Sequence, residues 1–245
     1  MRLIRAKNYD DMSLKAANII AAQVSLNPKS VLGLATGSTP VGTYRHLVEW
    51  YQKGELDFGK AVSINLDEYC GLSGDHPQSY RRFMRENLFN HINIPADRSF
   101  LPDGTQTDSA LECARYDRII AEHNGIDLQL LGIGRNAHIG FNEPDSCFAC
   151  GTHQVTLTES TIAANTRFFE NEAQVPRQAY SMGMQAIMQA KRVLLIASGA
   201  DKAEAIRNSF FGPVTPQVPA SILQLHRDVI VIADEAALAD CPAEA

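Results

Sequence analysis

Short apolar runs alternate along this chain with longer stretches in which apolar residues recur every three or four positions. The runs contain almost no polar side chains, which is typical of strands in a parallel sheet that helices cover on both faces. They predict strands at residues 31–35, 61–66, 128–133, 193–197 and 229–233. The longer stretches predict helices at residues 10–25, 40–53, 79–90, 108–124, 181–190 and 201–211.

Strands and helices in alternation indicate an α/β fold. We expect a single-domain, doubly wound, Rossmann-like and mostly parallel sheet with helices on both faces. The chain contains no internal repeat, low-complexity tract or linker, so one domain is expected to span residues 1–245. In such folds ligands bind at the carboxyl ends of the strands, so the residues that directly follow each strand are the first candidates for function.

Composition and charge exclude several classes of protein. The 245 residues are 45% hydrophobic and 20% charged, which is ordinary for a globular domain. A net charge of −6 without any basic run argues against a nucleic-acid partner or a membrane surface. No apolar stretch is long enough to span a bilayer, and the N-terminus turns polar before a signal-peptide core could form. With an odd number of cysteines, five, the sequence indicates reduced thiols and a cytoplasmic location.

A small polar loop follows the first predicted strand. It reads Thr36, Gly37, Ser38 and Thr39, and Pro40 then opens a helix. Free N–H groups and the positive end of a helix dipole make such a loop an anion site, and the hydroxyls add donors. Without the lysine of a Walker A motif, the loop suits a phosphate ester better than a nucleotide. A simple helix cap and turn is the alternative.

Two adjacent carboxylates, Asp67 and Glu68, come directly after the second predicted strand. A general base would stand at this edge of the sheet, and Asp67 is the better placed of the two. The alternatives are a helix cap for Asp67 and a solvated surface position for Glu68.

The segment after the third predicted strand is rich in glycine and contains His138. Histidine titrates near neutral pH and needs a partner to set its tautomer, and Asn136 and Glu143 are close enough in sequence to provide one. A structural histidine is the alternative, but this loop at a strand end favours catalysis.

Two cations complete the candidate site. Arg167 lies between aromatic and alanine residues, and Lys202 opens the helix that follows the fourth predicted strand. Together with the loop at residues 36–39 they could hold a phosphate dianion. Ordinary surface positions are the alternative for each.

Cys147 and Cys150 have the spacing of a redox pair or half a zinc site. Neither a preceding strand nor a second ligand pair accompanies them, so we expect no metal.

Five motifs taken together resemble the glucosamine-6-phosphate deaminase family over almost the whole chain. They occur in the order LGLATGSTP, NLDEY, LGIGRNAHIGFNEP, TIAANTRFF and ASILQLH. The resemblance implies a small-molecule amino-sugar phosphate as substrate: glucosamine 6-phosphate and water would give fructose 6-phosphate and ammonia. It implies no cofactor.

The resemblance also assigns roles to residues. Asp67 matches the enolisation base and His138 the residue that opens the pyranose ring. Glu143 and Asn136 match the positions that orient this histidine. The loop at residues 36–39, Arg167 and Lys202 match the phosphate clamp, and residues 151–169 are a candidate lid that brings Arg167 to the phosphate.

This chain departs from the family in two places. Asn136 stands where some members have aspartate, so we expect altered ring-opening kinetics or pH dependence. His153 and Val155 stand where allosterically activated members place cations, so hyperbolic kinetics and a monomer or small homo-oligomer are expected.

Two other functions fit parts of the pattern. One is a non-catalytic phosphosugar sensor, which would need neither a base nor a ring-opening histidine. The other is a 6-phosphogluconolactonase-like hydrolase, which shares the fold and first loop but releases no ammonia.

Overall fold

The computed structural model describes residues 1–166 and 169–242. Its main sheet contains seven described strands in the order β1-β10-β9-β6-β2-β3-β5, and every pairing is parallel. A smaller antiparallel sheet has the order β4-β8-β7. The strands are β1 (Arg2–Ala6), β2 (Val31–Leu34), β3 (Val62–Asn65), β4 (Asp67–Tyr69), β5 (Ser99–Phe100), β6 (Leu128–Leu131), β7 (His153–Thr156), β8 (Gln178–Ser181), β9 (Arg192–Ala197) and β10 (Val229–Asp234).

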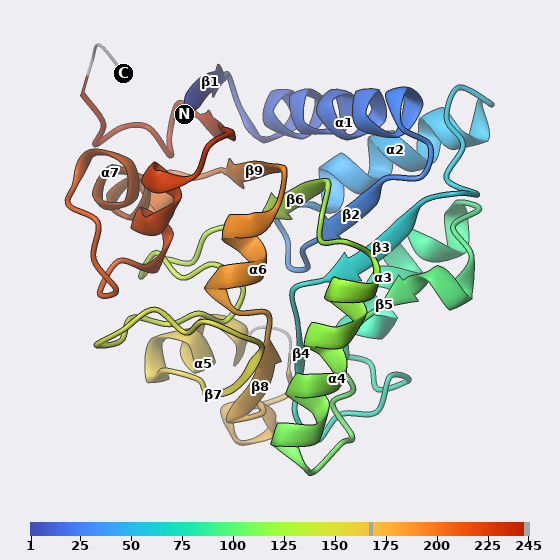
Figure 1. The fold of residues 1–245 in the computed structure, drawn as a ribbon. Coiled ribbons are helices and arrows are strands. Elements are labelled where there is room, and N and C mark those ends of the chain that lie inside the picture. The colour runs from blue at the N-terminus through green and yellow to red at the C-terminus, as the bar shows by residue number, and fades with distance from the viewer. Residues whose placement is uncertain (167–168, 243–245) are drawn as a thin grey trace.

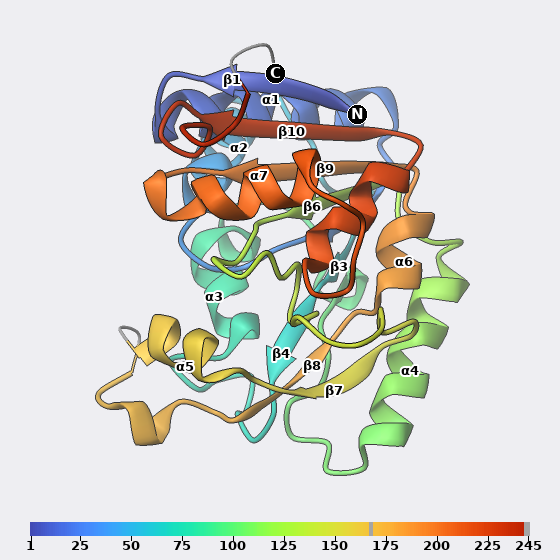
Figure 2. The same cartoon turned by 90° about the vertical axis from the view of Figure 1, so that its left-hand side faces the viewer.

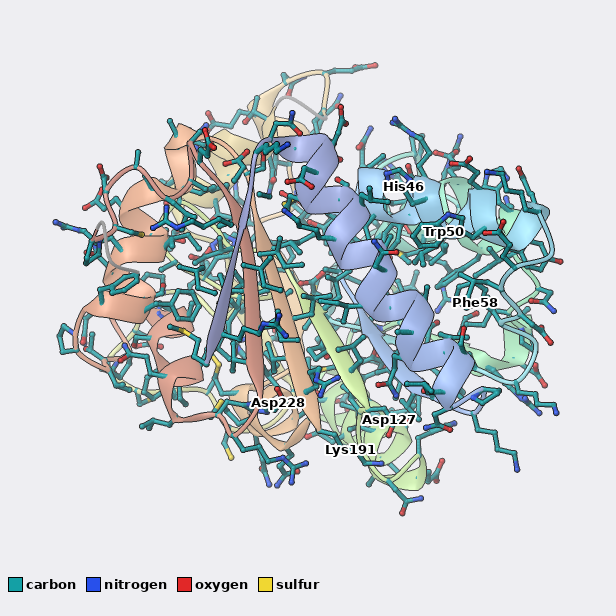
Figure 3. All side chains as sticks on the ribbon, turned by 90° about the horizontal axis from the view of Figure 1, so that it is seen from above. His46, Trp50, Phe58, Asp127, Lys191 and Asp228 are labelled. Carbon is teal, nitrogen blue, oxygen red and sulfur yellow. The ribbon has the colours of Figure 1, made fainter. Side chains whose placement is uncertain are left out.

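Helices cover both faces of the main sheet. They are α1 (Tyr9–Leu26), α2 (Val41–Gln52), α3 (Tyr80–Asn87), α4 (Ser109–Glu122), α5 (Glu159–Asn165), α6 (Met184–Gln189) and α7 (Ala203–Phe211). Figure 3 shows α1 and α2 on one side of the strands and α7 on the other. The predicted doubly wound α/β fold is therefore confirmed.

All five predicted strands are present, and their burial explains the apolar runs. The central strands β2, β3, β6 and β10 are buried at every position. A parallel strand between two helical layers has no solvent face, so its sequence shows no alternation. The edge strands β1 and β5 were not predicted, because β1 is largely accessible and β5 has only two residues.

The smaller sheet is the part of the fold that the sequence pattern did not predict. The helix expected at 181–190 begins only at Met184, because Ser181 ends β8. Likewise the helix expected at 79–90 ends at Asn87 and a 3-10 turn follows. In Figures 1 and 2 the small sheet lies below the main one, with α4 and α5 beside it.

Ion pairs hold the amino edge of the main sheet. Lys191 Nζ lies 2.6 Å from Asp127 Oδ1, and the other carboxylate oxygen of Asp127 accepts the Val31 N–H at 2.7 Å. Figure 3 labels this pair at the ends of β6 and β9. The opposite, carboxyl edge is open and carries the polar loops.

Candidate active site

A cleft of about 1100 Å³ opens at the carboxyl edge of the main sheet. Loops after β2, β3, β6 and β9 line it, as expected for a doubly wound fold, and α5 adds a further wall. Its lining includes these predicted site residues: Thr36, Gly37, Ser38, Thr39, Asp67, Asn136, His138 and Lys202. Glu143 lies directly behind His138, whereas Arg167 falls outside the described residues.

Asp67 and Glu68 lie on opposite faces of β4. Successive side chains of a strand alternate, so only one of the pair can face the cleft, and this is Asp67. Glu68 is instead 2% exposed and accepts the backbone N–H groups of Tyr80 and Arg81 and the hydroxyl of Ser79. The solvated position considered for Glu68 is wrong, because this carboxylate caps α3 from the interior.

The environment of Asp67 favours its protonated form. The side chain is 6% exposed. Burial raises the pKa of Asp67 to about 8, and the nearby charge of Glu68 acts in the same direction. A carboxyl whose pKa lies this close to neutrality can both accept and return a proton.

The loop that carries His138 is tightly constrained. Ala137 has φ of 64°, a left-handed conformation that is uncommon outside glycine. Gly134 packs against the imidazole, because a Cβ at this position would overlap the ring. The Gly134 N–H donates to the His138 carbonyl at 2.9 Å and closes the turn. These contacts leave the ring little freedom at the cleft wall.

His138 pairs with Glu143 through one ring nitrogen. Its Nδ1 lies 3.4 Å from Glu143 Oε2, which leaves Nε2 for the cleft. Asn136 Nδ2 donates to the same carboxylate oxygen at 2.7 Å, and Asn136 Oδ1 accepts the His138 N–H at 3.3 Å. The side-chain amide of Asn136 therefore orients Glu143 and the backbone of His138. Its effect on the imidazole is indirect and passes through Glu143.

Glu143 is held in its ionised form. Burial would raise the pKa of this carboxyl, but His138 and the hydrogen bonds from Thr161 and Asn136 outweigh it and lower the pKa to about 2. A permanent carboxylate behind the imidazole favours a proton on Nδ1 and stabilises the ring when it becomes charged.

The loop after β2 is braced from α1. The Tyr9 hydroxyl donates to the Ser38 carbonyl at 3.1 Å and accepts the Gly42 N–H at 2.8 Å. The Gly42 N–H belongs to the first turn of α2 and is already bonded to Tyr9. An anion bound at this loop would therefore contact the other donors of the loop. Gly37 has φ of 90°, which only glycine adopts readily, and this turn carries the loop into the cleft.

Two cations stand at the cleft near α7. Lys202 has a side chain that is 19% exposed and lies 3.8 Å from Asp201. Arg135, which sequence reasoning passed over, lines the cleft and contacts the same carboxylate at 2.9 Å. Its position beside His138 was visible in the sequence, but its partner Asp201 lies 66 residues away.

An aromatic wall faces the polar groups. Tyr69, Tyr80, Phe141 and Phe169 form it, with ring centroids of adjacent pairs 4.8 to 6.0 Å apart. These residues come from four separate segments, so no local sequence pattern indicated that their rings lie together.

The predicted lid segment contains β7, α5 and the linker between them, and α5 lines the cleft. Its movement stays a prediction. Cys147 and Cys150 are exposed free thiols, and Cys147 lines a separate cavity of about 320 Å³. Within the described residues no group of three or more His, Cys, Asp or Glu is placed to hold a metal ion. The described helices include none long and apolar enough to cross a membrane.

The parallel sheet and the polar cleft at its carboxyl edge define an α/β enzyme of the doubly wound class. A family model described as glucosamine-6-phosphate isomerases/6-phosphogluconolactonase matches residues 6–232. The chain belongs to this family.

Curated relatives match the chain over nearly its full length. The glucosamine-6-phosphate deaminase of Lachnoclostridium phytofermentans is 60% identical over 232 residues, covering 95% of this chain and 98% of the relative. That of Clostridioides difficile is 56% identical and covers 97% of this chain and 95% of the relative.

Solved structures agree with the fold. One described as a monomeric glucosamine-6-phosphate deaminase has a TM-score of 0.96 at 45% identity, covering 98% of this chain and 100% of that one. A 6-phosphogluconolactonase from Leishmania guyanensis has a TM-score of 0.77 at 21% identity, covering 99% of both chains. The second likeness shows the fold alone.

Proposed function

We propose that this chain is a glucosamine-6-phosphate deaminase, which converts glucosamine 6-phosphate and water into fructose 6-phosphate and ammonia. The single observation that carries the proposal is that Asp67 and the Glu143-paired His138 share one cleft. This combination of a base and an amphoteric group is what the reaction needs. Relatives of that name, 60% and 56% identical to the chain, support it.

Ring opening is the first step, because the C2 proton becomes acidic only beside an open-chain carbonyl. His138 would use Nε2 to move a proton from the anomeric hydroxyl to the ring oxygen. While the imidazole carries that proton, the ionised Glu143 stabilises its charge through Nδ1.

Isomerisation follows at Asp67. The carboxylate would remove the proton from C2 and return it to C1, while a second proton moves from the amino nitrogen to O1, which turns the amino aldose into a ketose imine. Water then adds at C2 and ammonia leaves. The pKa of about 8 falls when the substrate's ammonium comes near, since an opposite charge favours the carboxylate.

The phosphate would bind at the far end of the substrate from the reacting carbons. The loop at residues 36–39 offers N–H and hydroxyl donors, and Lys202 and Arg167 are the proposed cations. Binding energy from this end positions C2 against Asp67.

A coupled assay of ammonia and fructose 6-phosphate from glucosamine 6-phosphate, with chelator present, tests the proposal. We expect wild type to release both products and Asp67→Asn to lose about 10³-fold in kcat, the usual contribution of a general base. Asp97→Asn, the same change at an exposed position, serves as the control.

Two outcomes would contradict the proposal. Tight binding of the sugar phosphate without turnover indicates a sensor. Hydrolysis of 6-phosphogluconolactone without ammonia release indicates a lactonase. Turnover that the chelator abolishes would contradict only the expectation of no metal, and Cys147 and Cys150 would then be the candidate ligands.

A further inference from the structure

Glu143 is hydrogen-bonded from two directions by different parts of the chain. Its Oε2 faces the loop that carries His138, where Asn136 and His138 contact it. Its Oε1 faces the start of α5, where the hydroxyls of Thr161 and Thr158 lie 2.5 and 3.3 Å away. One carboxylate therefore joins the imidazole to a separate wall of the cleft.

Thr161 is the principal donor on the α5 side. A hydroxyl has one proton to donate, and the short contact shows that Thr161 donates it in a hydrogen bond to Glu143 Oε1. Thr158 is the N-cap of α5, and its oxygen lies within reach of three hydroxyl or carboxylate partners. Thr161 is only 4% exposed, so water is poorly placed to replace its hydrogen bond.

The helix that carries Thr161 is itself part of the cleft. Ser160, Thr161, Ala163 and Asn165 line the cleft from α5. Ile162, the residue after Thr161, packs in a small apolar cluster with Tyr69 and Leu157. Figure 2 shows α5 next to β7, away from the main sheet. A displacement of α5 would remove the Thr161 hydrogen bond from Glu143.

We propose that Thr161 is a positioning residue for ring opening. Its hydroxyl fixes Glu143, and Glu143 holds His138 with Nδ1 towards the carboxylate and Nε2 towards the sugar. The kinetic part of this inference rests on the proposed deaminase reaction.

Substitution of Thr161 tests the link, because valine removes the hydroxyl and keeps the shape. We expect Thr161→Val to lower kcat about tenfold, the usual effect of losing one hydrogen bond to a charged group, with KM within twofold. The loss of a donor also raises the pKa of Glu143, but from about 2 it stays below the assay range, so the rate profile should keep its shape. Thr161→Ser, which keeps the hydroxyl, restores kcat.

Matched variants separate this role from a general effect on folding. Thr107→Val makes the same change at an exposed position before α4, outside the cleft, and should leave kcat and the pH profile unchanged. Thr161→Ala is a second hydroxyl-free variant, used if valine prevents folding. The inference is overturned if the hydroxyl-free variants match wild type, if serine fails to restore activity, or if Thr107→Val shows an equal loss.

A measurement without substrate makes the inference independent of the reaction. The ¹⁵N shifts of the His138 ring report its tautomer and its contact with Glu143. We expect them to change in Thr161→Val and to return in Thr161→Ser. If wild type shows no turnover but these shifts respond, the proposed function fails and the link stands. Unchanged shifts refute the link, whatever the activity.

Discussion

At the scale of single residues, burial of Asp67 works against the stability of the fold. Burial lifts the pKa of Asp67 from 3.8 to about 8, so above pH 4 the folded state binds a proton that the unfolded state releases. The stability that this group contributes is therefore full below about pH 4 and is lost as the pH rises through 8. The proposed chemistry needs a titratable carboxyl at this position.

We expect Asp67→Asn to be more stable than wild type at alkaline pH, because the amide carries no charge at any pH. The gain should grow from about pH 4 to about pH 8, level off above that, and amount to roughly a few kcal/mol. Thermal unfolding of both proteins between pH 4.5 and 9 measures it. Asp97→Asn should show no such trend, and a difference independent of pH would count against the burial of Asp67.

Asn136 gives a second prediction at this scale. Its amide donates to Glu143 Oε2 at 2.7 Å, so Asn136→Asp would place two carboxylate oxygens in contact. A like charge raises the pKa of Glu143 above about 2 and favours a shared proton. We expect the acid limb of the kcat/KM profile to move to higher pH.

Rate profiles of wild type and Asn136→Asp between pH 4 and 9 measure this effect. Asn171→Asp, the same change on the exposed surface, is the control. An unchanged profile would show that Asn136 does not tune the histidine.

At the scale of elements, the starts of α1 and α2 meet at the loop proposed to bind phosphate. Tyr9 joins them through its hydroxyl, which contacts both the Ser38 carbonyl and the Gly42 N–H. Tyr9→Phe removes both hydrogen bonds and should destabilise the protein by about 1 kcal/mol. Because the loop would hold the non-reacting end of the substrate, we expect KM to rise about fivefold while kcat stays within twofold.

Steady-state kinetics, with inorganic phosphate as a competing ligand, measure the effect of Tyr9→Phe. Weaker inhibition by phosphate should accompany the higher KM. Tyr51→Phe removes a hydroxyl from the other end of α2 and should change neither value. A fall in kcat at constant KM would mean that Tyr9 acts on the reacting carbons instead.

Periodicity predicted the elements of the main sheet because each central strand is buried and each helix has one apolar face. It did not predict the small sheet, because β4 has only three residues and β7, whose positions are alternately half-buried and exposed, has only four. Segments this short carry too little pattern, and pairing across distant residues decides their conformation. This pairing matters for the site, since β4 orients Asp67.

At the scale of the whole molecule, we expect hyperbolic kinetics without activation by N-acetylglucosamine 6-phosphate. The separate cavity beside His153 and Val155 is lined by the carboxylates Glu143 and Asp145, and its described lining contains no lysine or arginine. Such a cavity disfavours an anionic activator, as does a net charge of −6.

Rate curves with and without the acetylated sugar phosphate, together with light scattering, test this expectation. A monomer or small oligomer should be found, in line with the relative described as monomeric. Sigmoidal curves that the acetylated sugar phosphate makes hyperbolic would refute it.

Local periodicity and residue type are enough to predict the class of fold, the order of the central strands and helices along the chain, and the chemical groups available after each strand. Long-range contacts are needed to place Asp67 in the cleft while Glu68 caps α3. They also direct Asn136 to Glu143 and bring Thr161 and Tyr9 to the site. Each of these placements depends on a contact between side chains or strands that are far apart in the sequence. The pairing of distant segments sets their positions, and no local pattern encodes such contacts.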